Sequence, residues 1–299
     1  MIQISKNKTP LIGALFMVLS GFCFAIGNGL TSIIVYGLGF KPQSDAFWQY
    51  LIALIIGLPV LFRFGAAALK TRHIGINVTR AVLSALGVQA FVMCFAFGLP
   101  LWKIVVLVMT SPFFILLGAG FILREKVGPE RWFAAALGFV GGLVVVQPWS
   151  TSFSWADLLP VVAAILWGIV SLMTKKLTAE EPSENITVWL LLLLTPINLG
   201  LSLHAGFEWP AGNILAYLLI GGLVIYLANF LLTKSYAVAD AAFVQPFDDL
   251  KLISNLLVSW WLGAQMPEGN LWLGIALIAG ASGFLVWHER QRTLPAPAE

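Results

Sequence analysis

The sequence contains ten apolar stretches, most of them close to the length of a membrane-spanning helix, joined by short polar links. A helix needs about 20 apolar residues to cross the hydrocarbon core of a bilayer. Such segments cross lipid as helices because every backbone hydrogen bond is then made within the segment. The sequence therefore predicts an all-α membrane protein with ten transmembrane helices, at residues 10–36, 44–63, 77–98, 101–121, 130–148, 155–175, 186–204, 211–232, 238–262 and 270–288.

The composition agrees with this class. Hydrophobic residues make up 59% of the chain and charged residues only 10%, whereas soluble domains carry about 25% charged residues. The links leave no room for a soluble domain, and no basic run interleaved with aromatic residues indicates a nucleic-acid partner. The expected partners are the lipid bilayer and a small-molecule substrate, with the protein a monomer or a dimer.

The basic residues predict the orientation of the chain. With the N-terminus in the cytoplasm, all of the 17 Lys and Arg residues except Lys41, Lys103 and Lys251 fall at cytoplasmic ends or links. Cytoplasmic links of membrane proteins are enriched in Lys and Arg, so this bias favours ten crossings with both termini in the cytoplasm.

The two halves of the chain resemble each other. A Pro-Glu pair followed by a glycine recurs at an offset of 138 residues, as Pro129, Glu130 and Gly142 and again as Pro267, Glu268 and Gly280. The fourth and ninth segments each carry a proline expected to break the helix, Pro112 and Pro246. The pattern predicts a repeat at 1–148, a second repeat at 149–292 and a disordered tail at 293–299. Five helices per repeat would insert the second copy upside down around a central cavity, an arrangement typical of transporters.

The ninth segment carries the strongest functional signal. Its central part contains Gln245, Asp248, Asp249, Lys251 and Asn255. Charged groups at that depth cost at least about 2.5–3.5 kcal/mol each, and they usually face protein or a water-filled cavity and serve function. A structural alternative also exists, because Asp248 and Lys251 are three residues apart and can pair on one helix face.

Further candidate cavity residues lie on other segments: Asn28, Ser84, Gln89, Trp167, Ser171, Tyr226 and Asn229. Tyr226 and Asn229 belong to a helical stripe with Gly222 and Thr233, a pattern that also serves helix packing. Ser84 and Gln89 lie about 140° apart around a helix, so both are not expected to face one cavity. Trp167 lies too deep for an interfacial belt, which leaves core packing or substrate contact.

Several chemistries are not expected. The three histidines, His73, His204 and His288, lie at segment ends on different sides of the membrane, which argues against a metal site or a nucleophile–histidine pair. The sequence has no G-x-x-x-x-G-K phosphate loop, which argues against ATP coupling within the chain. We therefore expect no enzymatic activity, no metal and no cofactor.

The layout and local motifs resemble the drug/metabolite transporter superfamily, in particular its EamA-type bacterial members. The motif is Pro112-Phe-Phe, then Phe121-Ile-Leu-Arg-Glu125, then Trp132 and the glycine-rich run 138–142. In the second half Pro246-Phe and Trp261-Leu-Gly match, whereas Arg124 and Ala264 depart from the usual Gly and Glu of the family.

The resemblance implies a multi-pass carrier in the bacterial inner membrane that works by alternating access. Its cavity would be lined mainly by the first, third, fourth, sixth, eighth and ninth helices. Because many members export amino acids, we expect this chain to export amino acids, among them aromatic or hydrophobic ones, or similar small metabolites. For such a solute, Lys251 would meet a carboxylate, Asp248 or Asp249 an ammonium or a proton, and Trp167 and Tyr226 an apolar side chain. The alternatives are an importer of nucleotide-like or quaternary-ammonium metabolites, a channel, or an intramembrane enzyme.

Overall fold

The structure is a computed structural model that describes residues 9–64, 70–118, 128–147, 149, 153–239, 244, 247–248, 250–261, 269 and 271–293. In this part of the chain the ordered elements are helical. They are α1 (Thr9–Ser32), a π-helical turn η1 (Ile33–Gly37), α2 (Pro42–Phe64), α3 (Ile74–Ala96), α4 (Leu101–Val108), α5 (Ser111–Gly118), α6 (Pro129–Val146), a 3₁₀ turn η4 (Trp155–Leu158), α7 (Leu159–Leu177), α8 (Ser183–His204), α9 (Asn213–Val238), α11 (Lys251–Trp261) and α12 (Leu271–Thr293).

Each predicted transmembrane segment overlaps at least one of these helices. Five described spans are long and apolar enough to cross a membrane by length and composition: Leu11–Gly37, Ile74–Ala96, Trp155–Leu177, Ser183–His204 and Asn213–Val238. The all-helical architecture predicted from the apolar pattern is thus confirmed.

The fourth segment is broken in its middle. α4 ends at Val108 and α5 begins at Ser111, so that Met109 and Thr110 form a turn. The Thr110 hydroxyl donates to the Leu107 carbonyl at 2.7 Å, which satisfies an acceptor at the end of α4. Pro112 is the second residue of α5, a position where its missing N–H costs little.

The boundary between the eighth and ninth segments differs from the prediction. α9 continues to Val238, six residues beyond the expected end at 232. In the ninth segment the structure describes α11 from Lys251 to Trp261, and Val244, Phe247 and Asp248 before it are also helical. The extension is stabilised by Lys175, whose Nζ donates to the Tyr236 carbonyl at 3.0 Å and to the Ala239 carbonyl at 2.7 Å. A cation is favourable at a helix C-terminus because it binds carbonyls that have no helical partner.

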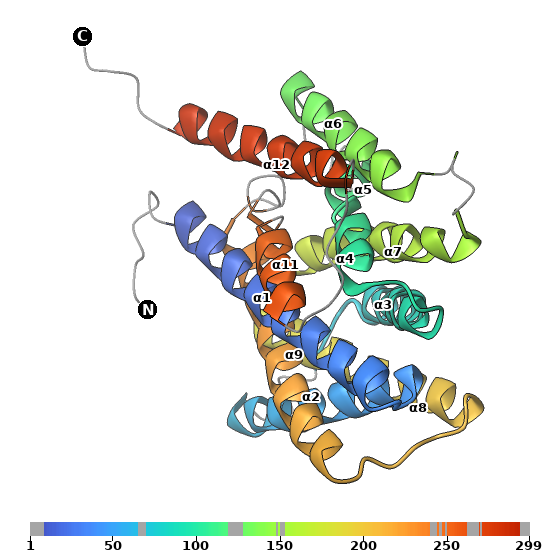
Figure 1. Cartoon of the computed structure of the whole chain (residues 1–299). Helices are drawn as coiled ribbons and strands as arrows, with labels where there is room; N and C mark the ends of the chain where they lie inside the picture. Colours follow the sequence, from blue (N-terminus) through green and yellow to red (C-terminus); the bar gives the residue numbers. More distant parts are fainter. Residues whose placement is uncertain are drawn as a thin grey trace.

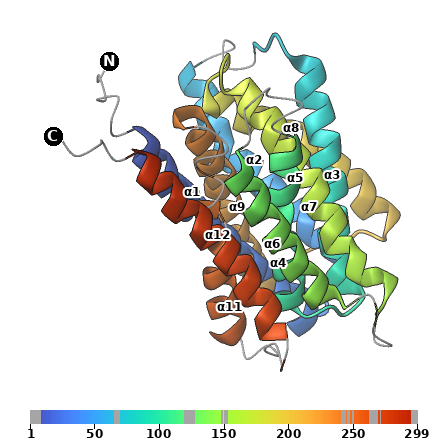
Figure 2. The same ribbon diagram turned by 90° about the horizontal axis from the view of Figure 1, so that it is seen from above.

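The helices form a bundle with two packing groups, a larger group that includes α1, α2, α3, α7, α8, α9 and α11, and the pair of α6 and α12. α1 lies along α9 and α11, α2 packs on α8 and α9, and α3 packs on α7, whereas α6 and α12 lie side by side at one edge (Figure 1). The view turned by 90° shows the same pairing of α6 with α12 (Figure 2). α4 is the most enclosed helix, because all its residues except Lys103 are buried. Lys103 is paired with Asp157 of η4, Nζ to Oδ1, at 2.6 Å.

The α6–α12 contact depends on two glycines. A Cβ added at Gly141 would lie 2.8 Å from the Gly274 carbonyl oxygen, and one added at Gly274 would lie 2.8 Å from the Gly141 carbonyl oxygen. The two backbones therefore touch, as at the small-residue crossings common in membranes.

We expect Gly141→Ala to destabilise the protein, since overpacking a close contact costs about 1–3 kcal/mol. Gly138→Ala in the same helix is the matched control, because its Cβ would meet the Ala281 Cβ at an ordinary 3.8 Å. Thermal unfolding of the two variants in detergent measures the difference. Equal midpoints would contradict a backbone contact between α6 and α12.

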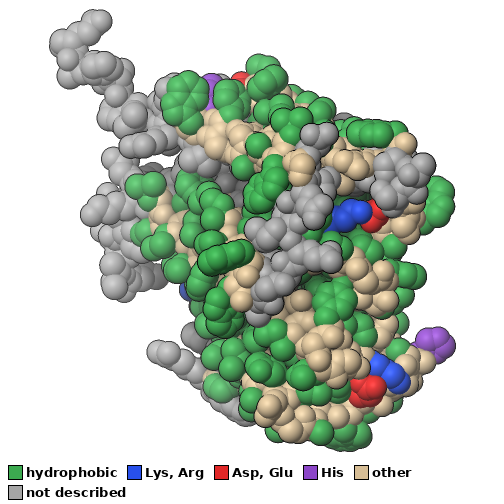
Figure 3. All heavy atoms as spheres, in the orientation of Figure 1, with side chains coloured by type: hydrophobic (Ala, Val, Ile, Leu, Met, Phe, Trp, Pro, Cys, Tyr) green, Lys and Arg blue, Asp and Glu red, His purple; other side chains and the backbone are tan. Residues whose placement is uncertain are grey.

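The outer surface suits lipid. The face in Figure 3 is largely apolar, with few charged side chains. Large apolar side chains are exposed along several helices, among them Leu11, Phe22, Leu86, Leu219 and Leu257. An apolar surface of this extent on a soluble monomer would be unusual, whereas in a bilayer it faces lipid tails.

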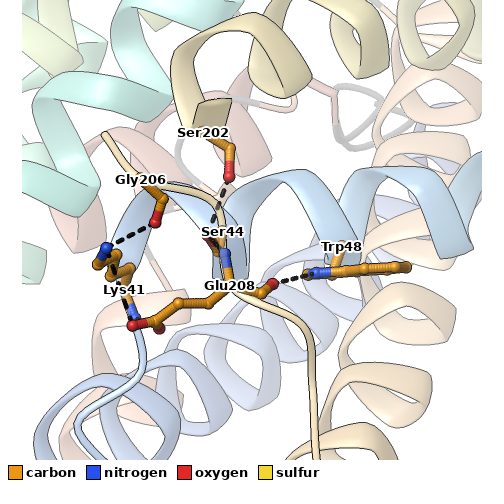
Figure 4. A network of polar contacts seen from close by, with 6 residues as sticks. All are labelled: Lys41, Ser44, Trp48, Ser202, Gly206 and Glu208. Carbon is orange, nitrogen blue, oxygen red and sulfur yellow. Dashed lines mark hydrogen bonds and ion pairs between the residues drawn. The ribbon is translucent and has the colours of Figure 1, made fainter. Parts of the chain in front are cut away.

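At one end of the bundle, a network of polar contacts joins the start of α2 to the α8–α9 link (Figure 4). The carboxylate of Glu208 accepts from the Lys41 backbone N–H at 2.8 Å, its carbonyl accepts from Trp48 Nε1 at 3.0 Å, and its N–H donates to the Ser44 hydroxyl at 3.1 Å. Ser44 also bonds Ser202 at 2.9 Å. These bonds hold the link against α2.

The opposite end has a corresponding contact between the α2–α3 and α7–α8 links. The Thr71 hydroxyl donates to Glu181 at 2.5 Å, and His73 Nε2 lies 2.8 Å from Glu180 Oε2. Both ends of the helix group around α2, α3, α7 and α8 are therefore joined by side-chain contacts.

Candidate functional site

The bundle encloses a cavity of about 130 Å³, measured as the space open to the centre of a water molecule. This volume is well above the roughly 10–15 Å³ that a single water molecule requires, so the cavity has room for a solute. The lining comes from the predicted first, third, fourth, sixth, eighth and ninth segments, together with the second and seventh: Phe24, Asn28, Tyr50, Arg80, Ser84, Phe91, Val105, Val108, Met109, Ser111, Ile115, Trp167, Val170, Ser171, Thr174, Leu190, Leu194, Asn229, Leu232, Thr233, Asp248, Lys251 and Asn255.

Eight of the residues predicted from sequence line this cavity: Asn28, Ser84, Trp167, Ser171, Asn229, Asp248, Lys251 and Asn255. Gln245, Pro246 and Asp249 lie outside the described residues, and of Pro112 only the backbone is described. Gln89 and Tyr226 are described, but the structure places both outside the lining.

The positions of Gln89 and Tyr226 have a packing explanation. Gln89 Nε2 donates to Asn198 Oδ1 at 3.0 Å, so its amide is satisfied between α3 and α8. Tyr226 stacks on Phe230, with ring centroids 6.0 Å apart, and lies against Gly57 of α2. The expected separation of Ser84 from Gln89 thus occurs, with Ser84 on the cavity side.

The α1–α11 side of the cavity is a polar cluster. Lys251 Nζ lies 2.5 Å from Asp248 Oδ2, the pair that their spacing of three residues predicts. The Asn255 amide donates to the Lys251 carbonyl at 2.8 Å, and its oxygen accepts from Asn28 at 3.0 Å. α1 can approach closely because Gly21 has no side chain: a Cβ there would lie 2.8 Å from the Lys251 Cβ.

The α3–α7 side carries aromatic rings at one level and an arginine at another. Trp167 and Phe91 have ring centroids 5.6 Å apart, and Gly87 leaves the room that the Trp167 ring occupies. Closer to the start of α3, the fully buried Arg80 donates through Nη1 to Thr174 at 3.1 Å and through Nη2 to the Ile186 carbonyl at 2.5 Å.

Sequence reasoning missed several lining residues, notably Arg80, Phe24, Tyr50 and Phe91. Arg80 was grouped with the cytoplasmic basic residues, because its position near the start of a segment fits that role. A signal was present, however: Arg80, Ser84, Gly87 and Phe91 are spaced at i, i+4, i+7 and i+11, which is one face of a helix. Aromatic residues in apolar helices give no such signal, since they are common throughout.

The chemistry of the lining is that of a binding site. It combines aromatic faces, three asparagine amides, several hydroxyls and both signs of charge. Among the described residues, no group of three His, Cys, Asp or Glu side chains is arranged to hold a metal ion. A multi-helix membrane bundle around a cavity of mixed polarity is the architecture typical of membrane transporters.

Within that class, the chain belongs to the EamA-like transporter family, whose model matches residues 11–147 and 154–287. It is therefore a secondary transporter of the drug/metabolite type and not an enzyme, and the ten-helix expectation agrees with the fold of this family.

Named relatives and a solved structure extend this comparison. The chain is 52% identical over 287 residues to a riboflavin transporter of Rhizobium johnstonii, covering 96% of this chain and 95% of that protein. It is 41% identical to a riboflavin transporter of Vibrio cholerae, covering 97% of both. A crystal structure with 18% identity superposes with a TM-score of 0.70 over 96% of this chain and 99% of the other, which shows a shared fold. Transport of a small metabolite is thus supported, whereas amino-acid export finds no support among these relatives.

Proposed function

We propose that the protein transports riboflavin, or a closely related flavin, across the membrane by alternating access. The observation that carries the proposal is the combination of aromatic faces and asparagine amides in one cavity, in a chain that is 52% identical to a riboflavin transporter over nearly its full length. A flavin is a flat three-ring heterocycle with carbonyl and nitrogen acceptors on its edge and a polyhydroxylated chain.

Each part of such a solute has a counterpart in the lining. Trp167 and Phe91 offer ring faces of the kind that stack on aromatic solutes in offset geometry. Asn28, Asn229 and Asn255 line the cavity, and each amide has donor and acceptor capacity beyond its bonds within the protein, which suits ring-edge carbonyls and hydroxyls. Riboflavin carries no net charge at neutral pH, so its binding does not require an unpaired ion in the cavity.

The charge arrangement argues against the amino-acid substrate expected from sequence. That reading needs Lys251 to meet a carboxylate and an aspartate to meet an ammonium. In the structure Lys251 and Asp248 neutralise each other at 2.5 Å. Separating a buried pair leaves each charge partly unsolvated, so the binding energy of a zwitterion would have to offset that cost. An uncharged heterocyclic solute, which is closer to the nucleotide-like alternative, can bind without separating the pair.

Counterflow in proteoliposomes tests the proposal. Vesicles loaded with unlabelled riboflavin should accumulate external labelled riboflavin transiently and saturably, because a carrier exchanges solute and a channel only equilibrates it. Excess phenylalanine should not compete. Absence of riboflavin counterflow in vesicles that sustain phenylalanine counterflow would restore the amino-acid reading, and non-saturable flux would indicate a channel.

We further infer an inner-membrane location with both termini in the cytoplasm and two inverted halves at 1–148 and 149–292. The inference rests on the basic residues, which gather at alternate links. Reporter fusions after Gln147 and after Gly269 are both expected to report the non-cytoplasmic side. A cytoplasmic signal at either position would contradict the orientation and the inverted repeat together.

A further inference from the structure

Arg80 is a buried cation with a hydrogen-bond donor left over. Its side chain is 0% exposed and lines the cavity. Nη1 and Nη2 bond Thr174, Ile186 and Asn77, but Nε has no acceptor. Among the described residues, no carboxylate lies within 4.0 Å of the guanidinium. Buried donors on charged groups are costly to leave unbonded, so such a group indicates a ligand or another missing acceptor.

The guanidinium is held in place by a chain of polar groups. Asn77 Oδ1 accepts from Arg80 Nη2 at 3.4 Å, while its amide nitrogen donates to the Thr71 hydroxyl at 3.2 Å. Thr71 in turn donates to Glu181. On the other side, Thr174 donates its own proton to the Val170 carbonyl at 2.8 Å and accepts from Arg80. The orientation of Arg80 is therefore set by protein bonds that do not use Nε.

Arg80 lies at one end of two adjacent stripes of cavity-lining residues, one on α3 and one on α7. On α3, Arg80 is followed at helical spacing by Ser84 and Phe91; on α7, Thr174 is preceded by Ser171 and Trp167. The two stripes run antiparallel, with Arg80 bonded to Thr174 at one level and Gly87 touching Trp167 at another. Trp167 and Thr174 are seven residues apart, which corresponds to about 10 Å along the helix axis. The wall thus changes from aromatic, through hydroxyl, to cationic.

We propose that the flavin binds with its ring system against Trp167 and Phe91 and its polyol chain along Ser84 and Ser171, so that Arg80 Nε donates to an oxygen near the end of that chain. Arg80 is then a specificity-determining residue for the polyhydroxylated tail. This rests on the proposed function and deepens it, since it assigns the polar part of the solute to a particular wall. Ring recognition, in contrast, does not involve Arg80.

The test compares two flavins in one preparation. Riboflavin and lumiflavin share the isoalloxazine ring, but lumiflavin has a methyl group in place of the polyol chain. Binding to purified protein is measured by the quenching of flavin fluorescence. Arg80→Gln is expected to weaken riboflavin binding roughly tenfold or more, the effect of losing one hydrogen bond to a charged donor, and to leave lumiflavin binding unchanged. Arg80→Lys should lie between the two.

The matched control is Thr79→Ala, which alters an exposed neighbour of Arg80 on the same helix and should leave both affinities as in the wild type. If Arg80→Gln weakens riboflavin and lumiflavin equally, or abolishes both, Arg80 supports the fold or the ring and the proposal is wrong. Unchanged riboflavin binding would also overturn it. If the wild-type protein binds neither flavin, it is the proposed function that fails.

Discussion

Replacing Lys251 with methionine is expected to lower transport at least about tenfold and to reduce the yield of folded protein. The Lys251 and Asp248 side chains are only 15% and 9% exposed, and they pair at 2.5 Å. Methionine keeps the length and apolar bulk of lysine but leaves the Asp248 carboxylate without its cation. Losing one member of a buried pair typically destabilises a protein by about 3–5 kcal/mol.

The double variant Asp248→Asn/Lys251→Met separates structure from function. Because it carries neither charge, it should recover the yield and thermal stability of the wild type. We expect its transport to remain low, because the cavity wall loses the Lys251 ammonium with its three N–H donors and the Asp248 carboxylate, both close to Asn255. Transport at near wild-type rates in the double variant would show that the pair only joins helices.

The second large effect is expected from Gly87→Ala. A Cβ at this position would lie 2.5 Å from Trp167 Nε1 and 2.8 Å from Trp167 Cδ1, distances that real side chains do not adopt. The indole must therefore move into the cavity or push α7 away from α3. We expect transport to fall at least about tenfold, because a large ring displaced by even 1 Å no longer fits its solute.

Gly75→Ala is the matched control, since Gly75 belongs to the same helix and has no atom within 4 Å of the added Cβ. Transport by the two variants is compared at equal amounts of inserted protein. The double variant Gly87→Ala/Trp167→Phe replaces the indole by a smaller phenyl ring, which leaves room for the added Cβ. This variant should therefore regain part of the lost activity. A Gly87→Ala variant as active as Gly75→Ala would show that the indole position is not tied to transport.

The sequence alone determined the class of the protein and its segmentation. Ten long apolar stretches leave few alternatives to a helical membrane protein, because lipid tails cannot form hydrogen bonds with unpaired backbone N–H and C=O groups. The close pairing of Asp248 with Lys251 was also predictable, since residues three apart share a helix face. The position of Pro112 marked the interruption of the fourth segment.

The tertiary structure decided which face of each helix meets the cavity. Lipid and protein core are both apolar, so a membrane helix lacks the contrast that reveals the inner face of a soluble helix. Hence Gln89 and Tyr226 were assigned to the cavity although they contact Asn198 and Phe230. Arg80 was assigned to the cytoplasmic end of a segment although it is fully buried and lines the cavity. The extension of α9 also depended on a distant residue, Lys175, whose contacts exist only once α7 and α9 have packed.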